Sequence, residues 1–118
     1  MPLVVYHYPN CSTCKKALAW LRAQAIEFQP IDIVQQPPTA AVLARAAKLG
    51  AVPTKKLFNV AGESYRAGNY KAKLPTMTDA EAYAALAADG KLIKRPLAID
   101  KDLALVGFDE AAWRAALV

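Results

Sequence analysis

The sequence lacks most of the features that assign a function directly. Its 118 residues include two cysteines and one histidine, no Lys/Arg run longer than two, and no apolar run near the roughly 20 residues of a transmembrane helix. The first residues show no basic region followed by a long apolar stretch, which argues against a secretory signal. We therefore expect a cytoplasmic protein without membrane segments.

The positive charge of the chain is modest, at a formal net +5. A nucleic-acid site usually needs a basic stripe with interleaved aromatic side chains, and this sequence has none. A small anionic substrate, an acidic protein partner and a solvated basic surface each account for the charge. We expect no direct contact with nucleic acid.

The strongest signal is a Cys-x-x-Cys pair. Cys11 and Cys14 follow an apolar run over residues 3–6 and a Pro-Asn turn, a helical pattern starts directly after Cys11, and the only histidine is His7. Unpaired N–H groups and the dipole at a helix start favour the thiolate, which is the nucleophile. Residues three apart on a helix lie about 5–6 Å apart, within disulfide range. This predicts Cys11, nearer the helix start and better exposed, as nucleophile and Cys14 as the resolving thiol.

Three other interpretations of the pair stay open at this point. Two buried thiols could be structural and inert. Half of a zinc site would need further ligands, and only His7 is available to join, so we expect no metal. A structural disulfide is the third, although two cysteines without a secretory signal disfavour it. A strand before the pair and a helix after it favour the redox interpretation.

The first part of the chain predicts a β-α-β unit. Residues 2–8 read as a strand that is apolar on both faces and therefore central in its sheet. Residues 12–24 show helical periodicity, with an apolar stripe that extends to Ala25. Residues 28–34 read as a second strand, and Pro30 places it at the sheet edge because proline cannot donate a ladder hydrogen bond.

The middle of the chain predicts mainly helices. Thr39 has the position of an N-cap, and Thr78 and Glu81 have the spacing of a capping box. The expected segments are helices over 39–50, 54–58 and 78–90 and an irregular polar stretch over 59–74.

The end of the chain predicts a hairpin followed by a helix. The two strands cover residues 91–99 and 103–106. Asp109 caps the last helix, and Phe108 and Trp113 occupy the two positions of a hydrophobic staple across that cap.

The dipeptide Arg95-Pro96 lies at the start of the first hairpin strand. In a βαβ–ββα arrangement this position commonly holds a cis-proline against the Cys-x-x-Cys loop. We therefore predict a cis bond, against the general preference for trans, that brings Arg95 beside Cys11.

Together these residues resemble the arsenate-reductase-related family of thioredoxin-fold proteins, which includes Spx-type regulators. The resemblance runs nearly end to end and rests on His7–Lys16, Pro37–Thr39, Leu57–Asn59, Gly62, Tyr65-Arg66, Lys73–Met77, Asp89–Leu97 and Val106–Phe108. It implies an α/β protein of thioredoxin/glutaredoxin-like fold, with a four-stranded mixed sheet (βαβ, then ββα) and a helical insertion between the halves. Residues 1–118 then form a single domain, with its core over about 1–36 and 91–118 and the insertion over about 37–90.

The resemblance also implies a site. In the glutaredoxin-coupled arsenate reductases of this family, a motif cysteine attacks the oxyanion, a histidine four residues earlier lowers its pKa, and arginines hold the anion. Cys11, His7 and Arg95 correspond to these three roles. The further residues expected to contact an anion or glutathione are Ser12, Thr13, Pro96 and Arg66. The family implies no bound cofactor, with glutathione or glutaredoxin as the reductant, and we expect a monomer.

Two features differ from those reductases. The third position after the nucleophile is Cys14 here, and no arginine stands near Phe58-Asn59 or Val106-Gly107, where two further anion-holding arginines would fall. The residues that could substitute, if they are not simply solvated surface charges, are Lys55, Lys56 and Arg66. A lysine supplies a point charge where arginine supplies a bidentate fork.

The second hypothesis is a regulator. Spx-type proteins resemble this chain in the Cys-x-x-Cys pair and the Arg-Pro hairpin, and they use the thiol pair as a redox switch while contacting RNA polymerase. They typically carry a further polar C-terminal extension, whereas this chain stops at Val118. We therefore expect a thiol-dependent oxidoreductase first and an RNA-polymerase-binding regulator second.

Overall fold

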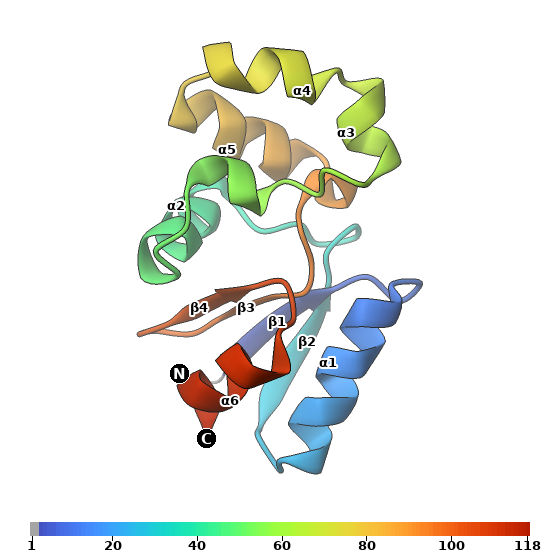
Figure 1. The fold of residues 1–118 in the computed structure, drawn as a ribbon, viewed down its shortest axis with the longest axis vertical. Helices are drawn as coiled ribbons and strands as arrows, with labels where there is room; N and C mark the ends of the chain where they lie inside the picture. The colour runs from blue at the N-terminus through green and yellow to red at the C-terminus, as the bar shows by residue number, and fades with distance from the viewer. Residues whose placement is uncertain (1–2) are drawn as a thin grey trace.

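The computed structural model describes residues 3–118 (Figure 1). Its strands are β1 (Leu3–His7), β2 (Phe28–Asp32), β3 (Leu97–Ile99) and β4 (Ala104–Val106). Its helices are α1 (Ser12–Ala23), α2 (Ala40–Leu49), α3 (Glu63–Ala67), α4 (Tyr70–Lys73), α5 (Asp79–Ala88) and α6 (Glu110–Leu117), with 3₁₀ turns η1 (Thr54–Leu57), η2 (Leu74–Thr76) and η3 (Gly90–Leu92). No helix of residues 3–118 is long and apolar enough to cross a membrane.

The four strands form one mixed sheet in the order β2-β1-β3-β4. The central strand β1 runs parallel to β2 and antiparallel to β3, with Val5 opposite Pro30 on one side and Ala98 on the other. The chain thus has the expected α/β fold, a βαβ half followed by a ββα half. Residue 2 of the first predicted strand lies outside the described residues.

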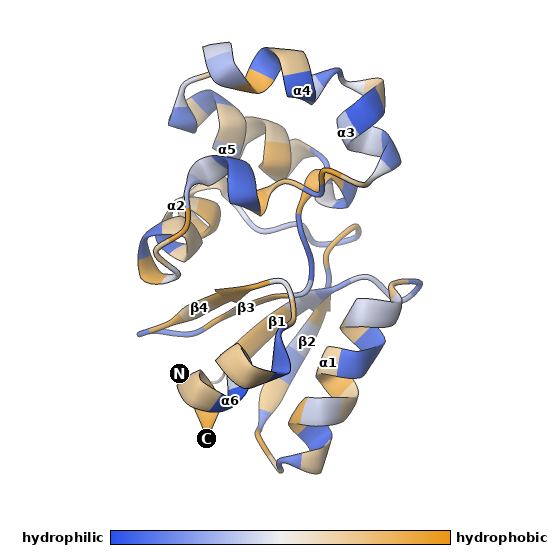
Figure 2. Cartoon of the chain, viewed as in Figure 1, coloured by the Kyte–Doolittle hydropathy of each residue, from blue (hydrophilic) through white to orange (hydrophobic). Residues whose placement is uncertain are grey.

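Helices cover both faces of the sheet, because successive side chains of a strand point to opposite faces. Leu3 and Val5 of β1 belong to a buried cluster with α1 and α6, which holds Leu21 and Trp113. The alternate residues of β1 pack against a second cluster, built on α2, α5 and the turns η1 and η3, which includes the fully buried Leu86. Figure 1 shows the two helical groups on either side of the sheet, and Figure 2 shows apolar colour along β1, β3 and β4 between them.

Side-chain caps fix the helix boundaries largely as the sequence indicates. The Thr39 and Asp109 side chains accept backbone N–H groups at the starts of α2 and α6. Thr78 and Glu81 form the complete capping box of α5. The ring centroids of Phe108 and Trp113 lie 5.1 Å apart across the α6 cap.

The prediction of an irregular stretch over residues 59–74 is wrong. This stretch contains α3, α4 and the start of η2. Each helix is only four or five residues long, too short for an apolar period to show in the sequence. A left-handed residue, Asn69 with φ of 56°, joins the two, and Tyr65 and Tyr70 stack with ring centroids 6.1 Å apart.

All four predicted strands are longer than the observed ones, the second and third by more than one residue at one end. The second strand ends at Asp32, whose Oδ1 accepts the N–H groups of Val34 and Gln35 and turns the chain. Residues 91–96 do not form part of the first hairpin strand, because η3 and an isolated bridge between Phe58 and Ile93 precede it. The apolar side chains of this segment, Leu92 and Ile93, are buried, and the segment pairs only through that single bridge.

Two helices also end earlier than expected. The helix α1 ends at Ala23, so exposed Ala25, with φ of 56°, is not part of its buried stripe. The helix α5 ends at Ala88, and Gly90 begins the turn η3 instead of ending that helix.

Gly90 should be sensitive to substitution, because a Cβ there would overlap the backbone carbonyl oxygen of Ile33. We expect Gly90→Ala to lower the free energy of unfolding by about 1–3 kcal/mol, the usual cost of overpacking, as measured by urea denaturation. Gly62→Ala is the control, since its nearest atom is the end of the Asn59 side chain, which can move. Equal losses in the two variants would show that backbone overlap at Gly90 is not the cause.

Candidate functional site

Cys11 lies at the N-cap of α1, directly after the loop that leaves β1. Its backbone N–H donates to the carbonyl of Tyr8 over 2.9 Å, and its Sγ accepts the backbone N–H of Cys14 over 3.4 Å. The sulfur therefore takes the place of a capping oxygen at the positive end of the helix. The residue is half-buried, so the sulfur stays open to a substrate.

Cys14 faces inward from the first turn of the same helix. It is 1% exposed, and its Sγ accepts the backbone N–H of Tyr8 over 3.5 Å. Burial, together with the hydrogen bond and charge of the neighbouring Cys11 sulfur, raises the pKa of Cys14 to about 12. In this structure the two cysteines are not joined by a disulfide.

Arg95 supplies positive charge beside Cys11. The Arg95-Pro96 bond is cis, as the sequence context predicted. The guanidinium carbon lies 4.8 Å from the centroid of the Tyr8 ring, and Nη1 donates to the Lys91 carbonyl over 3.1 Å. Stacking and hydrogen bonding thus fix the cation at the mouth of the Cys-x-x-Cys loop.

The Cys11 thiol has a lowered pKa. Partial burial acts to raise it, but the hydrogen bonds from the backbone and side chain of Cys14 and the charge of Arg95 together outweigh burial. His7 ends β1 opposite Asp32 and is not among the groups that lower this pKa. A larger fraction of Cys11 is therefore thiolate near neutral pH than in a free thiol.

Arg95→Gln should raise the Cys11 pKa, because it removes the nearby positive charge and keeps a polar side chain. At neutral pH less thiolate is then present, and alkylation of Cys11 by iodoacetamide should slow. The measurement is the pH midpoint of alkylation. Lys101→Gln, an exposed change in the β3–β4 turn, is the matched control and should leave the midpoint in place. Equal midpoints in both variants would contradict the role of Arg95.

The reactive sulfur opens into a pocket of about 450 Å³. Its lining residues are Cys11, Thr13, Asn59, Lys94, Arg95, Val106, Gly107, Phe108 and Asp109. The expected contact Thr13 is therefore at the site. Ser12 is exposed at the first helical position outside this lining, and buried Pro96 contributes its carbonyl, which accepts the Gly107 N–H over 2.9 Å.

Lys94 is a site residue that sequence reasoning missed. It lines the Cys11 pocket, and its stem crosses Gly107 so closely that a Cβ there would lie 2.9 Å from the lysine Cε. Gly107 has a φ of 72°, the left-handed region that favours glycine. Two features of the sequence could have indicated this role. Lys94 directly precedes Arg95, and Gly107 stands near the position where the family resemblance placed an arginine, which leaves room for another cation.

Arg66 does not reach the Cys11 pocket. It is exposed, donates to the carbonyl of Ala61 over 2.8 Å, and lines a separate hollow with Val60 and Tyr65. The structure thus does not bring this expected anion contact to the thiol.

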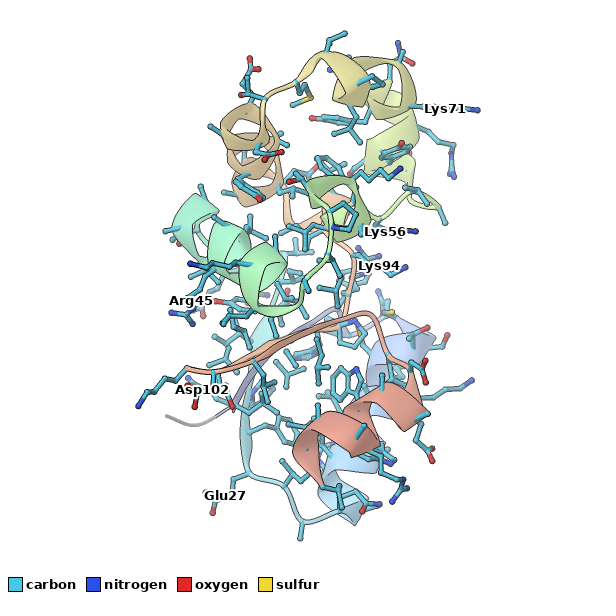
Figure 3. All side chains as sticks on the ribbon, turned by 60° about the vertical axis from the view of Figure 1, so that its left-hand side comes forward. Glu27, Arg45, Lys56, Lys71, Lys94 and Asp102 are labelled. Atoms are coloured by element: carbon cyan, nitrogen blue, oxygen red, sulfur yellow. The ribbon has the colours of Figure 1, made fainter. Side chains whose placement is uncertain are left out.

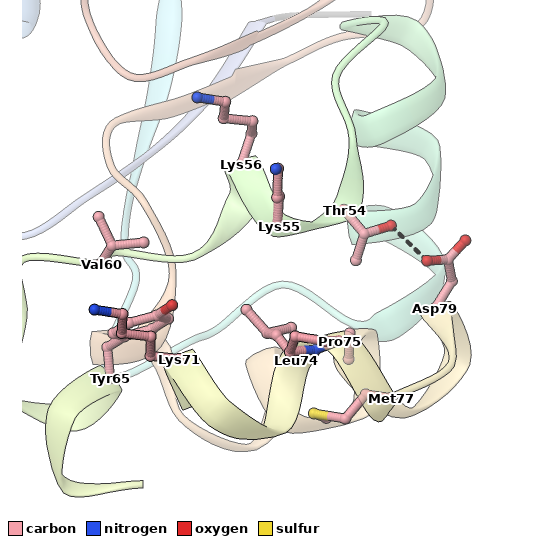
Figure 4. Close-up of a pocket in the computed structure, with 11 residues that line it drawn as sticks. Thr54, Lys55, Lys56, Val60, Tyr65, Lys71, Leu74, Pro75, Met77 and Asp79 are labelled. Atoms are coloured by element: carbon pink, nitrogen blue, oxygen red, sulfur yellow. Dashed lines mark hydrogen bonds between the residues drawn. The ribbon is translucent and has the colours of Figure 1, made fainter. Parts of the chain in front are cut away.

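Lys55 and Lys56 line a different pocket, of about 570 Å³, in the helical half of the chain (Figure 4). Its floor is apolar, and the Thr54 hydroxyl donates to Asp79 over 2.9 Å at its edge. No cysteine lines it, so the larger volume does not identify the reactive site. Figure 3 shows Lys56 and Lys94 extending from the same side of the molecule.

The residues 3–118 contain no group of three or more His, Cys, Asp or Glu side chains that could hold a metal ion. Fold and site together define an α/β protein of thioredoxin-like fold with a Cys-x-x-Cys pair at the start of its first helix.

Comparison with known proteins gives the family. The model of the ArsC family matches residues 6–116, and the chain belongs to that family. Over 110 residues, covering 93% of each chain, it is 43% identical to the uncharacterized protein YusI of Bacillus subtilis. The crystal structure of a putative ArsC family related protein from Bacteroides fragilis superimposes with a TM-score of 0.93 at 42% identity, covering 98% of this chain and 97% of the other.

Two further relatives, whose names give two different functions, are less similar to this chain than YusI. An arsenate reductase of Haemophilus influenzae is 29% identical over 91% of each chain. The global transcriptional regulator Spx of Bacillus subtilis is 23% identical over 92% of this chain and 81% of its own. The chain is thus related to both reductases and regulators.

Proposed function

We propose that the protein is a thiol-dependent oxidoreductase, with Cys11 as nucleophile and Cys14 as resolving thiol. The observation that carries the proposal is the contrast between the two sulfurs. Cys11 is accessible, lies at a helix start and has a lowered pKa, whereas Cys14 is buried with a pKa raised to about 12. Cys11 is therefore the more reactive nucleophile, and Cys14 stays protonated and inaccessible until the second step.

The reaction proceeds in two steps on a disulfide substrate. The Cys11 thiolate attacks one substrate sulfur, the substrate S–S bond breaks, and the leaving thiolate takes a proton from solvent. Cys14 then loses its proton, attacks the Cys11 sulfur and releases the second substrate thiolate. The substrate gains two electrons, and the protein is left with a Cys11–Cys14 disulfide.

The first step prepares the second. Burial is the largest cause of the raised Cys14 pKa, but the charge and hydrogen bond of the Cys11 sulfur also raise it. Both of these contributions end when Cys11 enters a mixed disulfide. The Cys14 thiol then ionises more readily, at the moment when its attack is productive.

Glutathione or a glutaredoxin would return the pair to its dithiol form. We place the reaction in the cytoplasm, where glutathione keeps thiols reduced. His7 ends the strand that leads into the Cys11 loop, but it is not among the groups that lower the Cys11 pKa, so we assign it no part in stabilising the thiolate. Thr13 and Arg95 are the proposed contacts for negative charge on the substrate, because they line the pocket of Cys11.

The test is a reduction assay that offers arsenate and a generic mixed disulfide in parallel, with glutathione, glutaredoxin and NADPH recycling. NADPH consumption with the disulfide that vanishes in Cys11→Ser would support the thiol reductase. Arsenate-dependent consumption would extend the activity to the oxyanion. No NADPH consumption with either substrate would contradict the proposed enzyme activity.

The second candidate is a redox-switched regulator that binds RNA polymerase. It is favoured by the same Cys-x-x-Cys pair and by the relationship to Spx. A pull-down with the C-terminal domain of the polymerase α subunit, with and without diamide, separates the two candidates. Binding that responds to diamide, without thiol turnover, would favour the regulator.

A further inference from the structure

The Cys11 pocket continues beyond Arg95 into a second hollow of about the same volume, 450 Å³. Asn59 and Arg95 line both, so the two hollows adjoin at these side chains. The second hollow contains no thiol and is lined further by Tyr8, Gly62, Glu63, Ser64, Ala67 and Lys91. A substrate confined to Cys11 and Arg95 would leave this hollow unused.

Arg95 forms a fixed partition between the two hollows. Its guanidinium stacks on Tyr8 at 4.8 Å and donates to the Lys91 carbonyl, and both residues belong to the second hollow. The same cation lowers the pKa of Cys11 in the first hollow. A chain that passes over Arg95 would therefore touch the reactive sulfur on one side and the α3 segment on the other.

The charges along this path have both signs. The first hollow contains Lys94 and Asp109, and the second contains Lys91 and Glu63. A compact oxyanion gains nothing from two carboxylates. A polypeptide segment carries both signs and backbone donors and acceptors, which the Asn59 amide can meet at the junction. The first hollow therefore has two cationic side chains, Lys94 and Arg95, and one carboxylate, Asp109. This net positive charge favours an acidic residue beside the substrate cysteine.

We propose that the substrate of this site is an extended peptide segment, carrying the sulfur that Cys11 attacks and crossing Arg95 into the second hollow. The inference rests on the proposed thiol chemistry and adds its substrate class. Each hollow falls within the roughly 300–1,000 Å³ typical of ligand sites, so side chains on both sides of the attacked cysteine can be held.

The test uses single-step exchange on the full chain with Cys14→Ser, so that Cys11 is the only thiol. The probes are 2-thiopyridyl disulfides of mercaptoethanol, of glutathione and of a pentapeptide with glutamate on each side of its cysteine. Cys11 attacks the probe sulfur, the probe S–S bond breaks, and thiopyridone leaves and is followed by its absorbance. No external reductant is involved.

Ala67→Trp narrows the second hollow, and Ala72→Trp, an exposed change on α4 outside both hollows, is its control. We expect the pentapeptide to react about tenfold faster than the mercaptoethanol probe, a ratio that Ala67→Trp lowers severalfold and Ala72→Trp does not. If the glutathione probe also reacts faster than the mercaptoethanol probe and also loses this advantage in Ala67→Trp, a tripeptide is long enough to cross Arg95. If the glutathione probe shows neither the faster reaction nor its loss, the substrate segment belongs to a longer polypeptide.

Glu63→Lys gives a second test that acts mainly through charge, since it adds far less volume to the hollow than Ala67→Trp. It should increase the preference for the glutamate pentapeptide over a lysine-flanked one severalfold. Equal rates for the pentapeptide and mercaptoethanol probes, or a rate ratio unmoved by both Ala67→Trp and Glu63→Lys, would overturn the peptide proposal. Because any exposed thiolate reacts with these probes, that result leaves the proposed function standing. The proposed function fails separately, in the turnover assay.

Discussion

Cys11→Ser is expected to lower the rate of thiol–disulfide exchange by at least about a thousandfold, as loss of a catalytic nucleophile does in other enzymes. A serine hydroxyl is not ionised near neutral pH, and it cannot form the mixed disulfide. Cys14 cannot take over, because it is 1% exposed and its pKa is raised to about 12. The measurement is reduction of a chromogenic disulfide under steady-state conditions.

Cys14→Ser is the matched comparison and should behave differently. It keeps the Cys11 thiolate, so the first attack still occurs, but the intermediate cannot be resolved within the protein. A mixed disulfide at Cys11 should accumulate and be visible by intact mass. If both serine variants retained full activity, the two-thiol mechanism would be wrong.

Trp113→Ala should cause a large loss of stability, about 3–5 kcal/mol in the free energy of unfolding. The side chain is 1% exposed and lies in the cluster that joins α1, α6 and the sheet. Its ring is 5.1 Å from Phe108 and 6.4 Å from Trp20 between centroids. Its Nε1 donates to the Gly107 carbonyl over 2.9 Å, which ties α6 to the wall of the Cys11 pocket.

Trp113→Phe separates packing from hydrogen bonding. It keeps an aromatic ring in the cluster but leaves the Gly107 carbonyl without its donor, at a cost of about 1–3 kcal/mol for a buried unpaired group. Thermal or urea unfolding of both variants gives the comparison. A loss in Trp113→Ala no larger than that in Trp113→Phe would contradict the packing account.

The reactive centre could be predicted because its determinants are local. The Cys11 N-cap, the inward orientation of Cys14 and the capping box at Thr78 all depend on spacings of three residues along the chain. The edge position of Pro30 follows from its missing N–H group. Each of these needs no knowledge of what packs against it.

The rest of the site depends on contacts between distant segments. The position of Arg95 could be anticipated only from its fold context, and Lys94 joins the Cys11 pocket because the chain folds its stem over Gly107. The resemblance implied that Arg66 contacts the anion, but its side chain donates a hydrogen bond to the Ala61 carbonyl and lies outside the Cys11 pocket. Residues 63–73 form helices whose short length hides their period, and aromatic stacking between Tyr65 and Tyr70 supports them.

The most direct test of the central claim is the pH dependence of alkylation of each cysteine, resolved by peptide mass mapping. The account predicts that Cys11 reacts with a midpoint below that of a free thiol, about 8.5, while Cys14 stays unreactive throughout the neutral range. A Cys11 midpoint at or above that of a free thiol, or alkylation of Cys14 before Cys11, would contradict it.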